Sequence, residues 1–239
     1  MWLRSASRFG FGIVLVLAVS GLLGCGGSQI ARYNPTTTPV RSIVLLKVPD
    51  HQTYSLTNNS ATMIGLYASM AKQGGFSKFL RDEGFNFGRE MTQALKDELE
   101  QSGYQVFLAE AERKDAYSLV SDYRVVLHSN RDAILDVVAG YGVGYTTGTA
   151  LDPDYRPCFT RLEVQLVSPR SEVVLYGEKI KYGSPNVFVG GTPVPAPKEH
   201  FYSDFEKLMS GSNAVDGMRA AVKDAARYIV RRIRTGGVQ

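Results

Sequence analysis

The sequence predicts an α/β (α+β) fold in which a mixed sheet of about five strands packs against helices. Three observations predict it. The apolar run within 41–48 is typical of a buried strand. Helix-period apolar stripes begin at Phe87 and at Val215. Between them, two alternating runs at 159–167 and 173–182 flank a short Ser-Pro-Arg-Ser turn, which predicts a hairpin. The expected order is β-α-β-α-β-β-β-α.

The first strand is expected over 41–48, because Pro49 cannot continue it. The following helix has an apolar residue at every fourth position, from Phe87 through Met91 and Leu95 to Leu99. Asn86 can cap its start, and Gly103 stands where a helix C-terminal glycine belongs.

The remaining elements follow from the same periodicities. We expect a short strand over 104–109, a partly helical segment over 111–129 and a long strand over 133–145, ahead of the hairpin. The final helix can begin at Asn213, and its arginines at 231, 232 and 234 suit the negative end of the helix dipole. Its apolar stripe comprises Val215, Met218, Val222, Ala225, Ala226, Ile229 and Ile233.

Residues 50–84 interrupt this regular order. Gly74 and Gly75 predict a break between two short helices that could hinge. Methionine and aromatic side chains suit adaptable apolar contacts, so this segment is the candidate interaction surface, facing a partner or the membrane. Alternatively, the same side chains cover one edge of the core. They are Met63, Ile64, Leu66, Tyr67, Met70, Phe76, Phe79 and Leu80.

The first 24 residues have the layout of a secretory leader. Arg4 and Arg8 precede an apolar stretch, and small residues then surround Cys25. A transmembrane anchor is the alternative, but a spanning helix needs about 20 mostly apolar residues, and the stretch from Phe9 to Cys25 is shorter and rich in glycine.

The sequence Leu22-Leu23-Gly24-Cys25 resembles the lipobox of bacterial lipoproteins. The resemblance implies that residues 1–24 are removed as a signal peptide and that Cys25 carries acyl chains such as palmitate. Residues 25–40, polar and containing Pro35 and Pro39, then form a flexible linker to a single domain over 41–239. No aspartate follows the cysteine, which by the rule of enteric bacteria favours the outer membrane, facing the periplasm.

Charge and motifs exclude several function classes. The formal net charge of +4 falls to +2 once the leader and its two arginines are removed, so nucleic acid is not an expected partner. No nucleophile elbow, zinc-protease motif or P-loop is present, and we expect neither a cofactor nor a metal. Cys158 has no expected partner and reads as a buried hydrophobe.

The element order, with Ser42-Ile-Val-Leu-Leu, the helix ending Leu99-Glu-Gln-Ser-Gly103-Tyr, and Asp132-Ala-Ile-Leu-Asp-Val-Val138, resembles a domain of envelope proteins. That domain is shared by the TolB N-terminal region, the curli-secretion lipoprotein and the lipoprotein activators of peptidoglycan synthases. The resemblance spans roughly residues 41–235 and implies a periplasmic partner protein or polymer.

The expected function is therefore that of a cell-envelope lipoprotein that acts as a binding or adaptor module and not as a catalyst. One alternative is a subunit of a homo-oligomeric secretion or pore assembly in the outer membrane. Another is a hydrolase with its site near Asp50 and His51, which follow the first strand where open α/β sheets commonly carry function.

Overall fold

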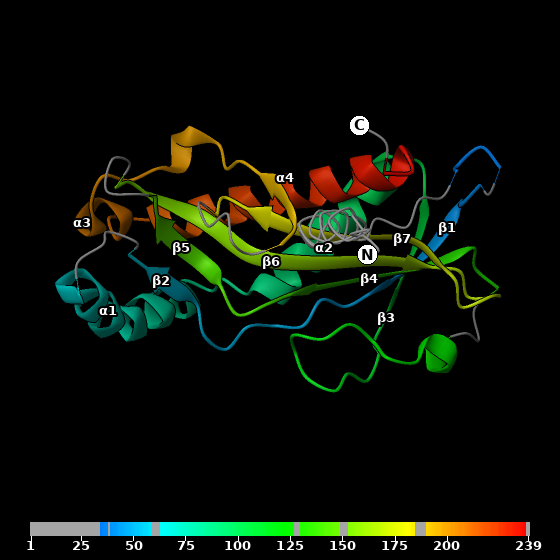
Figure 1. The fold of residues 1–239 in the computed structure, drawn as a ribbon, viewed down its shortest axis with the longest axis horizontal. Helices are drawn as coiled ribbons and strands as arrows, with labels where there is room; N and C mark the ends of the chain where they lie inside the picture. The colour runs from blue at the N-terminus through cyan, green and yellow to red at the C-terminus, as the bar shows by residue number, and fades with distance from the viewer. Residues whose placement is uncertain are drawn as a thin grey trace, which may run out of the picture.

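The fold is an α+β arrangement built on one mixed sheet of eight strands (Figure 1), which confirms the predicted fold class. The computed structural model describes residues 34–37, 39–58, 63–126, 130–148, 153–184 and 190–237, and leaves the side chains of 63–71 and 125 undescribed. The strands are β1 (Ser42–Leu46), β2 (Ser55–Thr57), β3 (Gln105–Ala109), β4 (Ala133–Ala139), β5 (Val143–Thr147), β6 (Tyr155–Val167), β7 (Val174–Tyr182) and β8 (Thr192–Val194).

Two strands organise the sheet. β1 lies between β3 and β4 and runs parallel to both. The long β6 pairs antiparallel with β4 and β5 and, at its other edge, with β7. The short β2 and β8 extend the sheet parallel to β5 and β7. The predicted hairpin of β6 and β7 is confirmed.

The strand expected over 133–145 is two strands, and this accounts for part of the difference between about five strands and eight. β4 ends at Ala139 and β5 begins at Val143, and the two pair with successive halves of β6. The chain between them approaches β6 closely, because a Cβ at Gly142 would lie 2.1 Å from the Thr160 hydroxyl. Only glycine tolerates such an approach.

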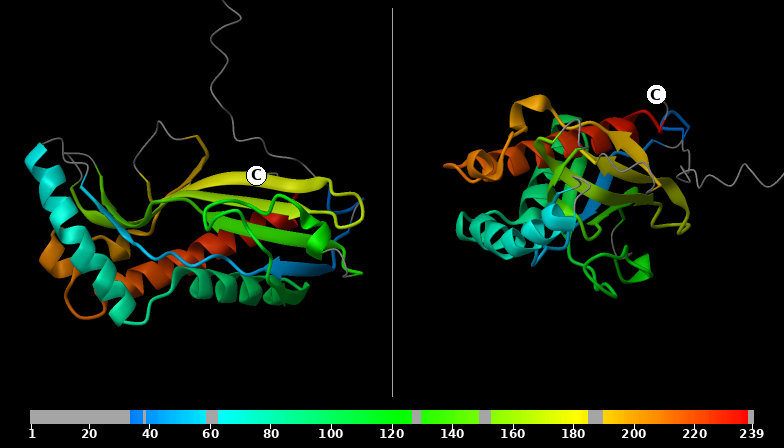
Figure 2. Two further views of the ribbon diagram at one scale, coloured as in Figure 1. Left: turned by 90° about the horizontal axis from the view of Figure 1, so that it is seen from below. Right: turned by 60° about the vertical axis from the view of Figure 1, so that its left-hand side comes forward.

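One face of the sheet is covered by two helices that pack side by side, α2 (Phe87–Gln101) and α4 (Asn213–Arg234) (Figure 2, left). Both predicted stripes are buried in the main core. Asn86 caps α2 as expected, accepting the Arg89 backbone N–H at 2.8 Å. In α4 the cap position belongs instead to Ser212, whose hydroxyl bonds the carboxylate of Asp216.

Of the arginines at the end of α4, Arg232 has a structural role. Its Nε lies 3.2 Å from Oε2 of Glu178 on β7, and both side chains are buried. The hydroxyl of Tyr176 bonds the same carboxylate, and that of Tyr228 lies 3.3 Å from its other oxygen. This ion pair joins α4 to the sheet.

The expected break at Gly74 and Gly75 is wrong: α1 (Met63–Asp82) passes through both glycines without interruption. A glycine costs a helix only about 0.5–1 kcal/mol relative to alanine. The burial of Phe76 and Leu80, immediately after the pair, outweighs that cost. Segment 50–84 therefore belongs to the same core as the rest of the domain, since Tyr54 and Leu56 join it too. The short α3 (Phe205–Leu208) lies near α1, at the left of Figure 1.

The helix expected within 111–129 is also absent from the part that the structure describes, apart from the 3₁₀ turn η1 (Tyr123–Val126). Side chains of the segment bond its own backbone instead. Asp115 accepts the Tyr117 N–H at 2.8 Å, and Asp122 accepts the Arg124 N–H at 2.9 Å. Such local bonds compete with helix formation. The segment covers the second face of the sheet, over a small core of Val44, Leu46, Val120 and Ile134.

The leader, Cys25 and most of the predicted linker lie outside the described residues, and so does His128. Among the helices that the structure does describe, none is long and apolar enough to span a membrane. Cys158 is buried on β6, as predicted, and burial raises the pKa of its thiol to about 12.

Candidate functional site

Three parallel strands end at the same edge of the sheet, and their exits bring distant residues together. β1, β3 and β4 run in one direction. We call the segments that follow them, 47–51, 110–120 and 140–142, the carboxyl edge. In open α/β sheets, ligands bind outside the carboxyl ends of the strands. This edge is therefore the first place to look for a site.

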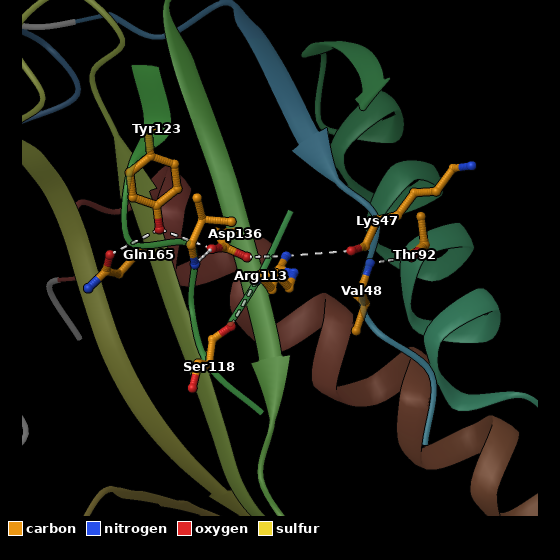
Figure 3. A network of polar contacts seen from close by, with 9 residues as sticks. Lys47, Val48, Thr92, Arg113, Ser118, Tyr123, Asp136 and Gln165 are labelled. Atoms are coloured by element: carbon orange, nitrogen blue, oxygen red, sulfur yellow. Dashed lines mark hydrogen bonds and ion pairs between the residues drawn. The ribbon is translucent and has the colours of Figure 1, made fainter. Parts of the chain in front are cut away.

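A buried carboxylate fastens the middle segment of the carboxyl edge to the sheet (Figure 3). Asp136 on β4 is completely buried, and its Oδ1 lies 2.6 Å from Nη2 of Arg113. Its Oδ2 accepts the Val120 backbone N–H at 2.8 Å and the Tyr123 hydroxyl at 3.0 Å. Both oxygens are thus satisfied, as a buried charge requires.

The same network reaches the other elements at this edge. Arg113 also donates to the backbone carbonyl of Ser118 at 3.2 Å. Burial and the neighbouring carboxylate of Asp136 raise the pKa of Tyr123, so its hydroxyl stays protonated and donates. On the far side of β1, the Thr92 hydroxyl of α2 accepts the Val48 N–H at 2.9 Å. The exits of β1 and β3 are therefore held in fixed positions.

His51 lies beneath this surface and is only 3% exposed. Its ring meets Phe87 and Tyr117 edge-on, with centroid distances of 5.3 and 5.4 Å. One ring nitrogen bonds the backbone carbonyl of Ala139, and Nε2 is buried without a hydrogen-bond partner in the described structure. Burial lowers the pKa of His51, and the Asp50 carboxylate and the carbonyl raise it only in part. The neutral ring is the favoured form.

This environment predicts a loss of stability in mild acid. The unfolded chain binds a proton at His51 near its ordinary pKa of about 6.5, whereas the folded chain resists it, so the free energy of unfolding falls as the pH drops below that value. Thermal unfolding at pH 7.5 and 5.5 should show a smaller drop in His51→Gln than in the wild type. Equal drops in both proteins would contradict the assignment.

Two tyrosines from different segments pack together at the carboxyl edge, where Tyr117 is half-buried and Tyr141 is exposed. Tyr117 and Tyr141 pack ring against ring, with centroids 3.9 Å apart. Tyr141 is 78% exposed and lies between Gly140 and Gly142, in the connection from β4 to β5. Tyr117 in turn rests on His51. The ring of Tyr141 is thus offered to solvent, and the buried ring of His51 supports its neighbour Tyr117 from below.

A pocket of about 410 Å³ opens at this edge. Its polar lining comes from the exits of β1 and β3, namely Lys47, Glu110, Arg113 and Asp115. Lys47 and Glu110 pair across it at 2.6 Å, and Arg113 is committed to Asp136. The charged groups of the pocket are thus partly paired with one another, and its lining ends at Ala116, next to Tyr117 in the chain.

The structure narrows the apolar interaction surface expected in segment 61–80. Phe76 and Leu80 are completely buried in the core, so a free molecule does not present them, and Phe79 is half-buried against the same core. This favours the alternative, in which the segment covers the core. Met63, Ile64, Leu66, Tyr67 and Met70 have side chains outside the described part of the structure.

Asp50 and His51 lie at the carboxyl edge, but not in the arrangement of a base and its orienting carboxylate. The carboxylate of Asp50 accepts the backbone N–H of His51 at 2.8 Å, while the ring bonds a carbonyl. A histidine base oriented by a carboxylate would have that carboxylate on its ring nitrogen. Among the described residues, no group of three histidine, cysteine or acidic side chains could hold a metal.

Sequence reasoning missed Asp136, Tyr117 and Tyr141. Asp136 did leave a signal, as the one charged residue in the apolar run Ala133–Ala139. A lone acid at the centre of a buried strand needs a partner. The two tyrosines gave no such signal, because they come together only through the pairing of β1 with both β3 and β4.

Comparisons with known proteins give little further information. No model of a protein family matches the chain, and no curated protein matches it. Among solved structures, it is similar to a Helicobacter pylori protein described as a neuraminyllactose-binding hemagglutinin homolog, with 15% identity over 84% of this chain and 89% of that one. The TM-score is 0.31. A likeness at this level carries no argument about function.

Proposed function

We propose that this chain is a lipid-anchored protein of the bacterial cell envelope that binds a periplasmic protein or polymer through its carboxyl edge, without catalysing a reaction. The observation that carries the binding role is the packing of Tyr141, which is 78% exposed, on Tyr117 at the exits of three parallel strands, with buried His51 beneath Tyr117. Aromatic side chains are enriched at protein interfaces, because they combine a large contact area with few rotatable bonds.

The proposed location rests on the amino-terminal sequence. A basic leader, a short apolar stretch and Leu22–Cys25 together support cleavage before Cys25 and acylation of its sulfur. One acyl chain binds a bilayer only marginally, whereas two or more anchor a protein stably. The absence of aspartate after Cys25 favours the outer membrane.

Cys25→Ala is expected to abolish incorporation of a labelled fatty acid and to release the protein from the membrane fraction, because no other thiol near the leader can accept the lipid. Cys158→Ala serves as the matched control, since that thiol is buried in the domain, and should leave labelling unchanged. Labelling that persists in Cys25→Ala would rule out the anchor.

The binding role is tested by copurification after mild crosslinking in cells. Tyr141→Ala should lose a partner that the wild type retains, with no change in thermal unfolding, because the side chain is mostly exposed. Val173→Ala is the control, being an exposed apolar residue in the turn between β6 and β7. Identical partners from all three proteins would count against the carboxyl edge.

One observation favours the alternative of a homo-oligomeric assembly. β3 is the last strand at its end of the sheet and carries two of the large apolar side chains exposed in the described structure. Exposed strand edges pair readily with other chains.

A further inference from the structure

The outer edge of β3 has free backbone groups. At the two ends of its ladder with β1, the Gln105 N–H donates to Arg41 at 2.8 Å and the Ala109 carbonyl accepts from Lys47 at 2.9 Å. Backbone groups alternate sides along a strand. Gln105, Phe107 and Ala109 therefore bond β1, while the N–H and C=O groups of Val106 and Leu108 point away from the sheet.

This edge lacks the usual protection against pairing. Proteins protect edge strands with charged residues, proline or bulges, and the five residues of β3, QVFLA, contain no charge and no proline. The register with β1 is regular throughout. Leu108 is 45% exposed and Phe107 37% exposed. No strand of the described residues pairs with this edge.

We infer that β3 pairs with β3 of a second copy of this chain, antiparallel and around a two-fold axis at Phe107. The N–H and C=O groups of Val106 in one copy then bond the C=O and N–H groups of Leu108 in the other. Leu108 of the first copy bonds Val106 of the second in the same way. Phe107 meets its own equivalent in the close, non-hydrogen-bonded position between them. One continuous sheet would cross the interface, and the contact would be isologous, because both copies use the same residues.

Charge complementarity favours a second copy of this chain as the partner and antiparallel as the direction of pairing. Arg41 lies beside the start of β3, where its backbone carbonyl accepts the Gln105 N–H at 2.8 Å. Glu112 follows the end of the strand, while Glu110 there is already paired with Lys47 at 2.6 Å. Antiparallel pairing brings the end with Arg41 of each copy to the end with Glu112 of the other, twice. Parallel pairing would place like charges together.

The contact is short, and stable interfaces bury roughly 1,200–2,000 Å². Dissolved molecules should therefore pair weakly. Anchoring both copies in one membrane raises their effective concentration. This last step rests on the proposed lipid anchor, whereas the pairing itself does not.

Cysteine crosslinking of the full chain tests the pairing. In Phe107→Cys, the two-fold axis places equivalent Cα atoms about 4.5 Å apart, within the range that a disulfide bridges. Mild oxidation of membranes should give a linked dimer. Gln105→Cys is the matched control: it is exposed on the same face of the strand, but its equivalents are separated by about 13 Å along the pair. The unaltered chain controls for native thiols, since Cys158 is buried.

A second variant separates edge pairing from chance collision. Leu108→Lys, added to Phe107→Cys, should reduce the linked dimer at least tenfold while leaving thermal unfolding unchanged, because the Leu108 side chain is exposed. No dimer at Phe107→Cys, equal dimer at Gln105→Cys, or a link to a different protein would each overturn the inference. The purified chain at high concentration should give the same pattern, so a failed membrane anchor would not be mistaken for failed pairing.

Discussion

Replacing Asp136 by Asn is expected to destabilise the fold by about 3–5 kcal/mol, because it leaves the buried guanidinium of Arg113 without its counter-charge. Asparagine has one oxygen and one NH₂ group in place of the two carboxylate oxygens. Its NH₂ group would therefore face donors, either Arg113 or the Val120 N–H and the Tyr123 hydroxyl. Chemical denaturation measures the loss. The expected loss of stability is large for so small a change in the side chain. Most substitutions of exposed polar residues change the free energy of unfolding little.

Asp82→Asn provides the comparison for Asp136→Asn. Asp82 pairs with Lys78 on the exposed surface of α1, where such pairs contribute little. Limited proteolysis adds a local readout, because loss of the Asp136 network should expose segment 110–126 to cleavage before the rest of the domain unfolds. If both variants unfold alike and 110–126 stays protected, Asp136 does not fasten the carboxyl edge.

Ile229→Ala is expected to cost about 2–5 kcal/mol, the usual range for removing a large side chain from a close-packed core. Ile229 is completely buried where α4 packs on the sheet. Arg227, two positions earlier, lies on the exposed side of the helix and reaches Glu98 of α2 at 3.4 Å. Arg227→Ala should therefore change thermal unfolding little, and equal losses in the two variants would contradict the orientation of α4.

The elements with clean periodicity were predictable from the sequence. The four-residue repeat that starts at Phe87 and the stripe that starts at Val215 each place one apolar face against the sheet, and the structure has both helices there. Both predictions succeeded because local propensity and tertiary packing agree. The hairpin of β6 and β7 was predictable for the same reason.

Other elements depend on contacts that the local sequence does not contain. Two glycines favour a break at 74–75, yet burial of Phe76 and Leu80 carries α1 through it. Segment 111–126 has helical composition, but its Arg113 and Tyr123 bond Asp136 on another strand. The carboxyl edge needs His51, Tyr117 and Tyr141 in contact, and only the order of the parallel strands places them so.

The central claim is that the carboxyl edge is where this protein binds another component of the envelope. A photo-reactive amino acid at position 141 tests it most directly, because a side chain that is 78% exposed in the free molecule would be covered in the complex. Irradiation of living cells should give one adduct of defined mass at position 141 and none with the same probe at Val173. The absence of an adduct at 141, or the same adduct at both positions, would contradict the claim.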